Sequence, residues 1–250
     1  MQGLRKEADM TEAYPIPDFL RRQPEQPAGP RERPILFSPE MVRAILAGTK
    51  TQTRRALKVQ PIDVIPFEGD KAGIEWVGHM QNDPPRGVVF RCKFGQPGDR
   101  LYVKEKHAFL DVTKSALSRF PLVGGGFGPD VWNLCIEYCD GTENDAFSVE
   151  GEKPKQTRER GEDRWRPSIH MPRWASRILL EIVAIRVERL QDISEADCVA
   201  EGCAGGHGSI PGYGYSATPA EHYRWLWELI NGAGSWDVNP WVWCLTFKRV

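Results

Sequence analysis

The sequence lacks a long apolar run and lacks a large net charge of either sign. Its 250 residues carry 33 basic and 34 acidic side chains, for a formal net charge of -1. Without a long apolar stretch, no membrane-spanning helix is expected. Without a secretory signal, the six cysteines are expected to be reduced thiols of a cytoplasmic protein. Because the total charge is balanced, any contact with nucleic acid must come from local basic patches.

Several signatures of cofactor sites are also missing. Gly124–Gly128 lacks the Gly-Lys-Ser/Thr ending of a phosphate-binding loop, so a nucleotide triphosphatase is not expected. The pairs Cys135/Cys139 and Cys198/Cys203 lack the usual spacing of a zinc knuckle, and we expect buried thiols and no metal or cofactor. A zinc site that includes His207 is the alternative. Without heptads or repeats, a monomer is expected.

The composition that remains is that of a globular protein. Hydrophobic residues make up 40% and aromatic residues 10% of the chain, enough for a full core. Residues 1–33 mix five prolines with charges and lack periodicity, which predicts a mobile tail. Residues 34–250 are predicted to form a single domain.

Capping signals predict three helices. The predicted N-caps are Ser38, Ser194 and Thr218, and the predicted ends are Gly48, Gly202 and Gly232. The third helix carries an apolar stripe that is expected to face the core, made of Tyr223, Leu226, Trp227 and Ile230.

Alternating or β-branched runs predict strands between these helices. They cover residues 35–37, 87–94, 100–104, 131–138, 178–187 and 241–247, whereas 60–86 is expected to be irregular. In the last strand, Trp241, Trp243, Leu245 and Phe247 are expected to form the inner face. This mixture predicts an α+β fold, a small barrel with flanking short helices.

Two stretches are candidate sites. The turn Gly48–Arg55 is too polar for a core and rich in donors, so it suggests a bound anion or polar ligand; a solvated basic turn is the alternative. Lys153–Arg177 interleaves arginines with aromatic residues, which suits stacking on bases and pairing with phosphates; a charged loop is the alternative. Its candidate ligand-binding residues are Arg166, His170, Arg173 and Trp174.

Glu201 is a third candidate. It falls in the last turn of the second predicted helix, where a carboxylate faces the negative end of the helix dipole. This placement inclines the acid toward a raised pKa, as a general acid or base requires, although an exposed glutamate is the alternative.

The turn, the Pro97–Leu101 strand entry and the helix ending at Glu201 together resemble an ASCH domain. Gly48, Lys50, Thr53 and Arg55 match the family signature Gly-x-Lys-x-x-Glu/Thr-x-Arg. The resemblance implies a PUA-like β-barrel. The larger chain is similar to phage or prophage ASCH proteins, with segments at about 60–86, 106–166 and 203–217 as insertions.

The threonine form of the signature is similar to small bacterial amidohydrolases that remove the acetyl group from N4-acetylcytidine. The resemblance implies Lys50, Thr53 and Glu201 as catalytic residues. Thr53 would attack the acetyl carbonyl, Lys50, kept neutral by Arg54 or Arg55, would accept its proton, and Glu201 would orient Lys50 or protonate the leaving amine. Residues expected to bind substrate from the turn are Gly48, Thr51, Arg54 and Arg55.

Two other functions fit the same residues. The protein could be a module that binds single-stranded RNA or a modified base without cutting it. It could also be a ribonuclease of the ASCH type, with Lys50 stabilising the phosphorane and Glu201 or His170 as the base. The expected partners are therefore a modified nucleoside or single-stranded RNA.

Overall fold

The computed structural model describes residues 29–68, 72–81, 86–111, 131–138, 142, 147–150 and 165–250. The chain divides into two units, Met1–Pro30 and Arg31–Val250, and all helices and strands given below lie in the second. Most of the predicted tail, residues 1–28, lies outside the described residues. The last residues of the predicted tail are described, and Glu32 and Arg33 already belong to the first strand.

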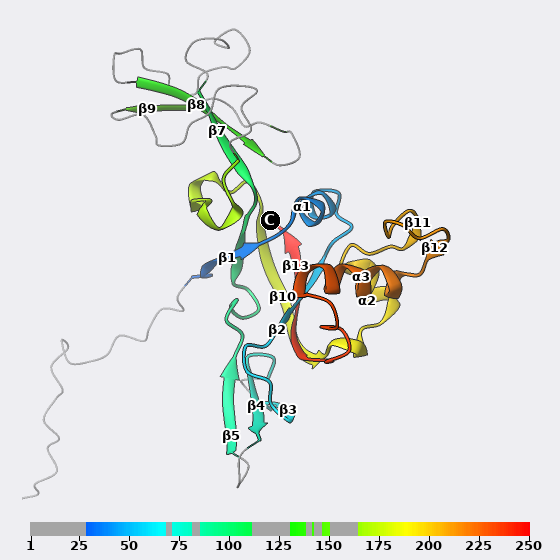
Figure 1. Ribbon diagram of the computed structural model, residues 1–250. Coiled ribbons are helices and arrows are strands. Elements are labelled where there is room, and N and C mark those ends of the chain that lie inside the picture. The colour runs from blue at the N-terminus through cyan, green and yellow to red at the C-terminus, as the bar shows by residue number, and fades with distance from the viewer. Residues whose placement is uncertain are drawn as a thin grey trace, which may run out of the picture. The chain divides into compact units, whose positions relative to one another are not determined.

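A five-stranded sheet forms the centre of the second unit (Figure 1). The strands, in their order across the sheet, are β1 (Glu32–Leu36), β6 (Arg100–Lys104), β10 (Leu179–Arg189), β13 (Trp241–Arg249) and β2 (Gln52–Ala56). β1 and β6 are parallel, and the other neighbours are antiparallel.

β13 is buried on both faces. Trp243, Leu245 and Phe247 pack into the main core with residues of β6 and β10, as expected. Val242 and Cys244, predicted to point outward, are also fully buried, because β13 is an inner strand with helices on its second face. Val242 belongs there to a second apolar cluster with Tyr223 and Trp227.

The three predicted helices are confirmed. They are α1 (Pro39–Leu46), α2 (Glu195–Ala200) and α3 (Pro219–Asn231). The side chains of Ser38, Ser194 and Thr218 each accept a bond from the backbone three residues on. The three glycines that follow have φ angles of 76°, 95° and 98°, a region in which glycine is favoured.

Further strands lie in segments that were predicted as insertions. β3 (Asp63–Pro66), β4 (Glu75–Met80) and β5 (Arg86–Arg91) form one sheet, so the prediction that residues 60–86 are irregular was wrong. β7 (His107–Asp111), β8 (Val131–Tyr138) and β9 (Phe147–Glu150) form another. β11 (Gly206–His207) and β12 (Ser216–Ala217) pair within 203–217. The short 3-10 helices among the described residues are η3 (Ser168–His170), η4 (Arg173–Ala175) and η5 (Leu190–Asp192).

The fold is therefore a mixed α+β fold, mostly sheet with few helices, but the expected barrel is not closed within the described residues. β1 and β2 are the edge strands, and α1 connects them in sequence. α1 buries Val42 and Ile45 in the same core as Ile35 of β1, so a helix covers this end of the sheet. In a closed barrel, backbone hydrogen bonds would join the edge strands β1 and β2. Here a side chain of β2 reaches β1 instead, since Arg55 Nη2 donates to the carbonyl oxygen of Leu36 at 2.6 Å.

Candidate functional site

The turn after α1 is held against the end of α2. The backbone N–H groups of Thr49 and Lys50 both donate to the carbonyl oxygen of Ala44, at 2.9 and 3.1 Å. The N–H of Thr51 donates to the carbonyl oxygen of Ala200 at 2.8 Å. Because Ala200 is the last residue of α2, this contact brings the turn next to Glu201.

Lys50 and Glu201 form a buried ion pair. Lys50 Nζ lies 2.7 Å from Glu201 Oε2 and also donates to the backbone carbonyl oxygen of Glu201 at 2.8 Å. The Lys50 side chain is 0% exposed and that of Glu201 is 4% exposed. The ring centroid of Phe37 lies 5.8 Å from Nζ, so three groups that attract a positive charge surround the amine.

The guanidinium of Arg54, a predicted substrate-binding residue, is enclosed by carboxylates. Nη1 lies 3.2 Å from Glu201 Oε1, Nε donates to Glu188 Oε1 at 2.8 Å, and Nη2 donates to Asp197 Oδ2 at 2.9 Å. Burial lowers the pKa of Arg54, but the surrounding groups, including Cys244, Glu201 and Glu188, raise it overall. Arg54 is therefore a buried cation with three carboxylate partners.

The charges of this cluster balance. Arg186 pairs with Glu188 Oε2 at 2.7 Å and with Asp197 Oδ2 at 2.8 Å. Three cations, Lys50, Arg54 and Arg186, thus face the three carboxylates of Glu188, Asp197 and Glu201. Burial raises the pKa of Asp197, but Arg54 and Arg186 outweigh it and hold the pKa below its ordinary value of 3.8.

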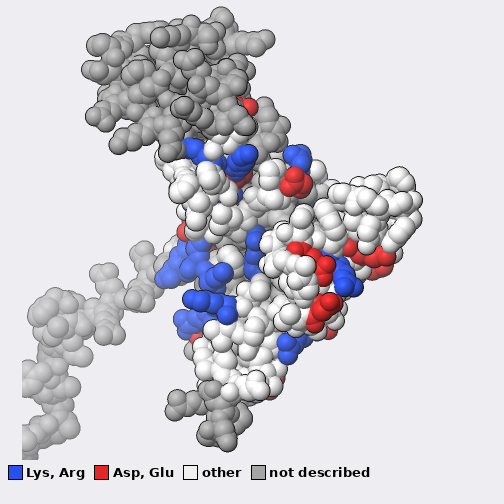
Figure 2. All heavy atoms as spheres, viewed as in Figure 1, with Lys and Arg blue, Asp and Glu red and all other residues white. Residues whose placement is uncertain are grey.

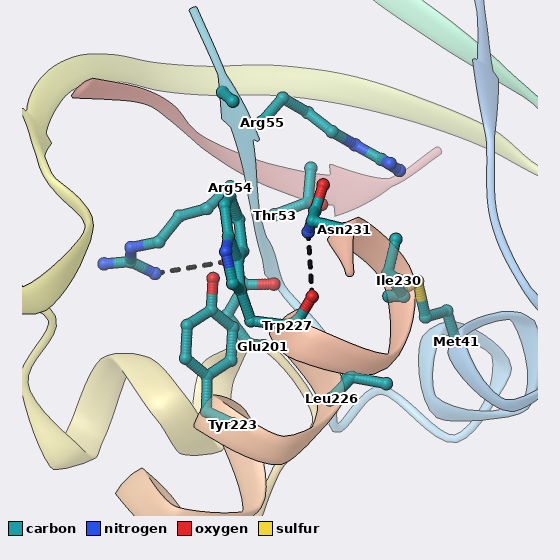
Figure 3. Close-up of a pocket in the computed structure, with 11 residues that line it drawn as sticks. Met41, Thr53, Arg54, Arg55, Glu201, Tyr223, Leu226, Trp227, Ile230 and Asn231 are labelled. Carbon is teal, nitrogen blue, oxygen red and sulfur yellow. Dashed lines mark hydrogen bonds and ion pairs between the residues drawn. The ribbon is translucent and has the colours of Figure 1, made fainter. Parts of the chain in front are cut away.

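Beside this cluster, a pocket opens between β2, α1 and α3 (Figure 3). Its lining residues are Met41, Thr53, Arg54, Arg55, Ala56, Glu201, Tyr223, Leu226, Trp227, Ile230 and Asn231. The cavity volume is about 60 Å³, against roughly 10–15 Å³ for one water, so it has room for a small planar group such as an acetamide. A larger molecule that carries this group would extend into the open mouth. We call this cavity the Thr53 pocket.

Two residues that line the Thr53 pocket each carry a buried donor without a hydrogen-bond partner in the part of the chain that the structure describes. These donors are Arg55 Nε and Trp227 Nε1. Figure 3 shows Arg54 and Arg55 leaving β2 in opposite directions, as successive residues of a strand do. The Arg55 guanidinium lies 5.3 Å from the ring centroid of Phe37, and burial lowers its pKa.

The stripe on α3 was assigned to the core, and this was only half right. Tyr223 and Trp227 are buried in the second apolar cluster, but Ile230 is 50% exposed, and the whole stripe also lines the Thr53 pocket. Burial, with the Glu201 charge second, raises the pKa of Tyr223 well above its ordinary value, so its hydroxyl keeps its proton. Helical spacing alone does not distinguish a core face from a pocket wall.

The other predicted turn residues lie elsewhere. Gly48, Lys50 and Thr51 line a different pocket, and Lys50 does not line the Thr53 pocket. The structure thus brings Thr53, Arg55 and Glu201 to one cavity and holds the Lys50 amine behind Glu201.

None of the four candidates from the second basic stretch lines the Thr53 pocket within the described residues. The Arg166 guanidinium lies over the ring of Phe109, and Trp174, which is 62% exposed, stacks on that ring at 5.6 Å. Arg173 pairs with Glu32, and His170 is an exposed residue of η3. Residues 153–164 of this stretch lie outside the described residues.

The cysteines near the site are buried thiols. Cys198 and Cys203 belong to the second apolar cluster, and burial raises their pKa values to about 11 and about 12. In the described part of the chain, no three His, Cys, Asp or Glu side chains are arranged to hold a metal ion. No helix among those residues is both long and apolar enough to cross a bilayer.

Comparison with known protein families, with curated protein sequences and with solved structures found no match to this chain.

Proposed function

We propose that the protein is an amidohydrolase of the ASCH type, with an open variant of the PUA-like fold, which removes the acetyl group from the exocyclic amine of an N4-acetylated cytosine. The observation that carries the proposal is the buried contact of 2.7 Å between Lys50 Nζ and Glu201 Oε2, beside a pocket that contains Thr53. The hydroxyl of Thr53 and the acid Glu201 line this pocket, and the amine of Lys50 is bonded to the acid; a hydroxyl, an acid and an amine are the groups that acyl transfer needs.

The proposed reaction begins with a proton transfer within the ion pair. Lys50 passes one proton to Glu201, which leaves a neutral amine that accepts the proton of the Thr53 hydroxyl. Thr53 Oγ1 then forms a bond to the acetyl carbon. When the carbon–nitrogen bond breaks, the leaving cytosine amine takes a proton from Lys50. Water then attacks the acetyl ester while it gives a proton to Lys50, and Lys50 passes that proton to Thr53 Oγ1 as the ester bond breaks. Acetic acid leaves and ionises to acetate, and Glu201 returns its proton to the neutral amine of Lys50.

The two unpartnered donors of the Thr53 pocket complete this scheme. A tetrahedral intermediate carries a negative oxygen, which hydrogen-bond donors in a site sheltered from water stabilise strongly. Arg55 and Trp227 line the pocket, and their buried donors Nε and Nε1 have no partner among the described residues, so we assign these donors to this oxygen. In this proposal Tyr223, whose hydroxyl stays protonated, and Asn231 face the cytosine ring.

The test is incubation of the purified protein with N4-acetylcytidine, followed by mass spectrometry for cytidine and acetate. We expect cytidine to form, and we expect Thr53→Val and Lys50→Met to lower kcat at least ~100-fold, as loss of a nucleophile or its base does. Thr49→Val, in the same turn but outside the Thr53 pocket, is the matched control and should retain activity. Intact N4-acetylcytidine after prolonged incubation would contradict the proposal.

One observation favours a second function, a module that binds a modified base without cutting it. The Lys50 side chain is 0% exposed and its amine bonds to two oxygens of Glu201, an arrangement that also suits a purely structural ion pair. In that case N4-acetylcytidine would bind and remain intact. Calorimetric titration that shows binding to wild type and undiminished binding to Thr53→Val, with no acetate released, would support this alternative.

A further inference from the structure

A second, larger pocket lies next to the Thr53 pocket, and Ala56 lines both. The chain from Thr53 to Val59 runs along the two cavities in sequence, first as β2 and then as the segment that follows it. The second cavity has a volume of about 280 Å³ and is bounded on its other side by β4 and β5. We call it the Phe90 pocket.

The floor of the Phe90 pocket is apolar and aromatic. Phe90 and Trp243 meet edge to face with ring centroids 5.6 Å apart, and Leu57 and Met80 continue this surface. At its margin, Val59 is 57% and Val88 is 43% exposed, so apolar surface faces solvent around the opening. Aromatic surfaces of this kind stack nucleic-acid bases without requiring a particular sequence, because every base has a π-face.

The rim of the Phe90 pocket is positively charged. Lys58, Arg91 and Lys93 line it, and no acidic side chain does so among the described residues. Arg91 is paired with Glu75, which leaves the two lysines as the cations available to an incoming anion. Lys58 is exposed and makes no ion pair within the part of the chain that is described. Figure 2 shows further Lys and Arg side chains on the face that carries β1.

We propose that the Phe90 pocket holds the nucleotide next to the acetylated cytidine, so that the substrate is a single-stranded nucleic acid. The inference rests on the proposed hydrolase function. An aromatic floor binds a base, and a lysine rim binds the phosphate that links it to its neighbour. Thr53 and Ala56 are three residues apart on a strand, about 10 Å, which is within reach of the next one or two nucleotides of an unstacked strand.

The experiment compares two substrates, the nucleoside N4-acetylcytidine and a single-stranded RNA pentamer with one central N4-acetylcytidine. We expect kcat/KM of the wild type to be at least tenfold higher for the pentamer. Lys58→Glu and Lys93→Glu should each lower the ratio of the two kcat/KM values about tenfold. Arg249→Glu, an equal reversal of charge on an exposed residue at the end of β13, should leave that ratio unchanged.

The outcomes separate the subsite from the hydrolase. If both substrates are hydrolysed with equal efficiency, and Lys58→Glu affects both alike, the subsite is overturned and the hydrolase stands. If neither is hydrolysed, the hydrolase is wrong, and binding of a fluorescent RNA pentamer decides the subsite. Lys58→Glu should then weaken binding about tenfold and reduce the salt slope of log K by about 0.7. If wild type, Lys58→Glu and Arg249→Glu all bind the pentamer with equal affinity, the subsite proposal is overturned.

Discussion

At the scale of single residues, Glu201 pairs with two buried cations and stabilises their charges. One of its carboxylate oxygens lies 2.7 Å from Lys50 and the other 3.2 Å from Arg54, and all three side chains are almost completely buried. Removing charges from water is costly, so a buried cation depends on its anionic partner. Lys50 depends on Glu201, whereas Arg54 also contacts Glu188 and Asp197.

This difference in partners predicts an asymmetry in stability. Glu201→Gln leaves Lys50 buried without an anion and should lower the free energy of unfolding by about 3 kcal/mol. Lys50→Met should lower the free energy of unfolding by at least ~1 kcal/mol less than Glu201→Gln does. In this variant Glu201 still pairs with Arg54, and the methionine fills a similar space. Urea denaturation measures both. Glu40→Gln, on a side chain that is 71% exposed, is the control, with a change within about 0.5 kcal/mol. A larger loss of unfolding free energy for Lys50→Met than for Glu201→Gln would contradict this account.

At the scale of elements, the same charge cluster joins three segments that are distant in sequence. Arg54 belongs to β2, Arg186 and Glu188 to β10, and Asp197 to α2. Asp197 contacts both arginines, so it links the helix to two strands that are separated in the sheet by β13. Protonation of this carboxylate would remove the link.

The cluster therefore predicts a loss of stability in acid. The pKa of Asp197 in the folded state lies below its ordinary value of 3.8, so its contribution is present above about pH 4 and is lost as the pH falls through the lowered pKa. We expect Asp197→Asn to have a lower Tm than the wild type at pH 7, and a smaller fall in Tm between about pH 5 and pH 3. Asp192→Asn, at an exposed residue of η5, is the control. Parallel Tm curves for wild type and Asp197→Asn would refute the linkage.

At the scale of the whole described unit, the β3-β4-β5 sheet is attached to the central sheet by aromatic packing. Trp76 of β4 meets Trp243 of β13 edge to face with ring centroids 4.9 Å apart. Trp76 is 3% exposed and belongs to the main core cluster. The same Trp243 forms part of the floor of the Phe90 pocket, so this contact shapes a proposed binding surface as well as the core.

Loss of this contact should destabilise the whole unit. We expect Trp76→Ala to lower the free energy of unfolding by about 3–5 kcal/mol, as large-to-small changes of buried aromatic residues do. Val89→Ala, on a β5 side chain that is 53% exposed, should cost less than about 1 kcal/mol. Urea denaturation followed by tryptophan fluorescence tests both variants. A small effect of Trp76→Ala, with a separate early transition, would show that β3-β4-β5 unfolds on its own.

The elements that could be predicted are those with local signals. The caps at Ser38, Ser194 and Thr218 act on backbone groups three residues away, so the helices were found correctly from sequence. β3 and β4 were missed because their stability comes from pairing with each other and with β5, and from the contact of Trp76 with Trp243, a residue far away in sequence. Barrel closure was predicted from the order of elements, which does not specify whether two edge strands meet.

The site shows the same division. The donor-rich turn and the acid Glu201 at the end of α2 were recognisable from residue types and helix limits. The choice of Lys50 and Thr53 within the turn came from the resemblance to the ASCH signature. Only the structure showed that the Arg54 guanidinium bonds to Glu188 and Asp197 and that the α3 stripe also lines a pocket. Only the structure showed that this lining does not include Arg166, His170, Arg173 or Trp174. Capping and strand alternation act over a few residues and can be read along the chain. Ion pairs across 134 to 151 residues, such as Arg54 with Glu188 and Lys50 with Glu201, depend on burial and on how the sheet brings distant segments together.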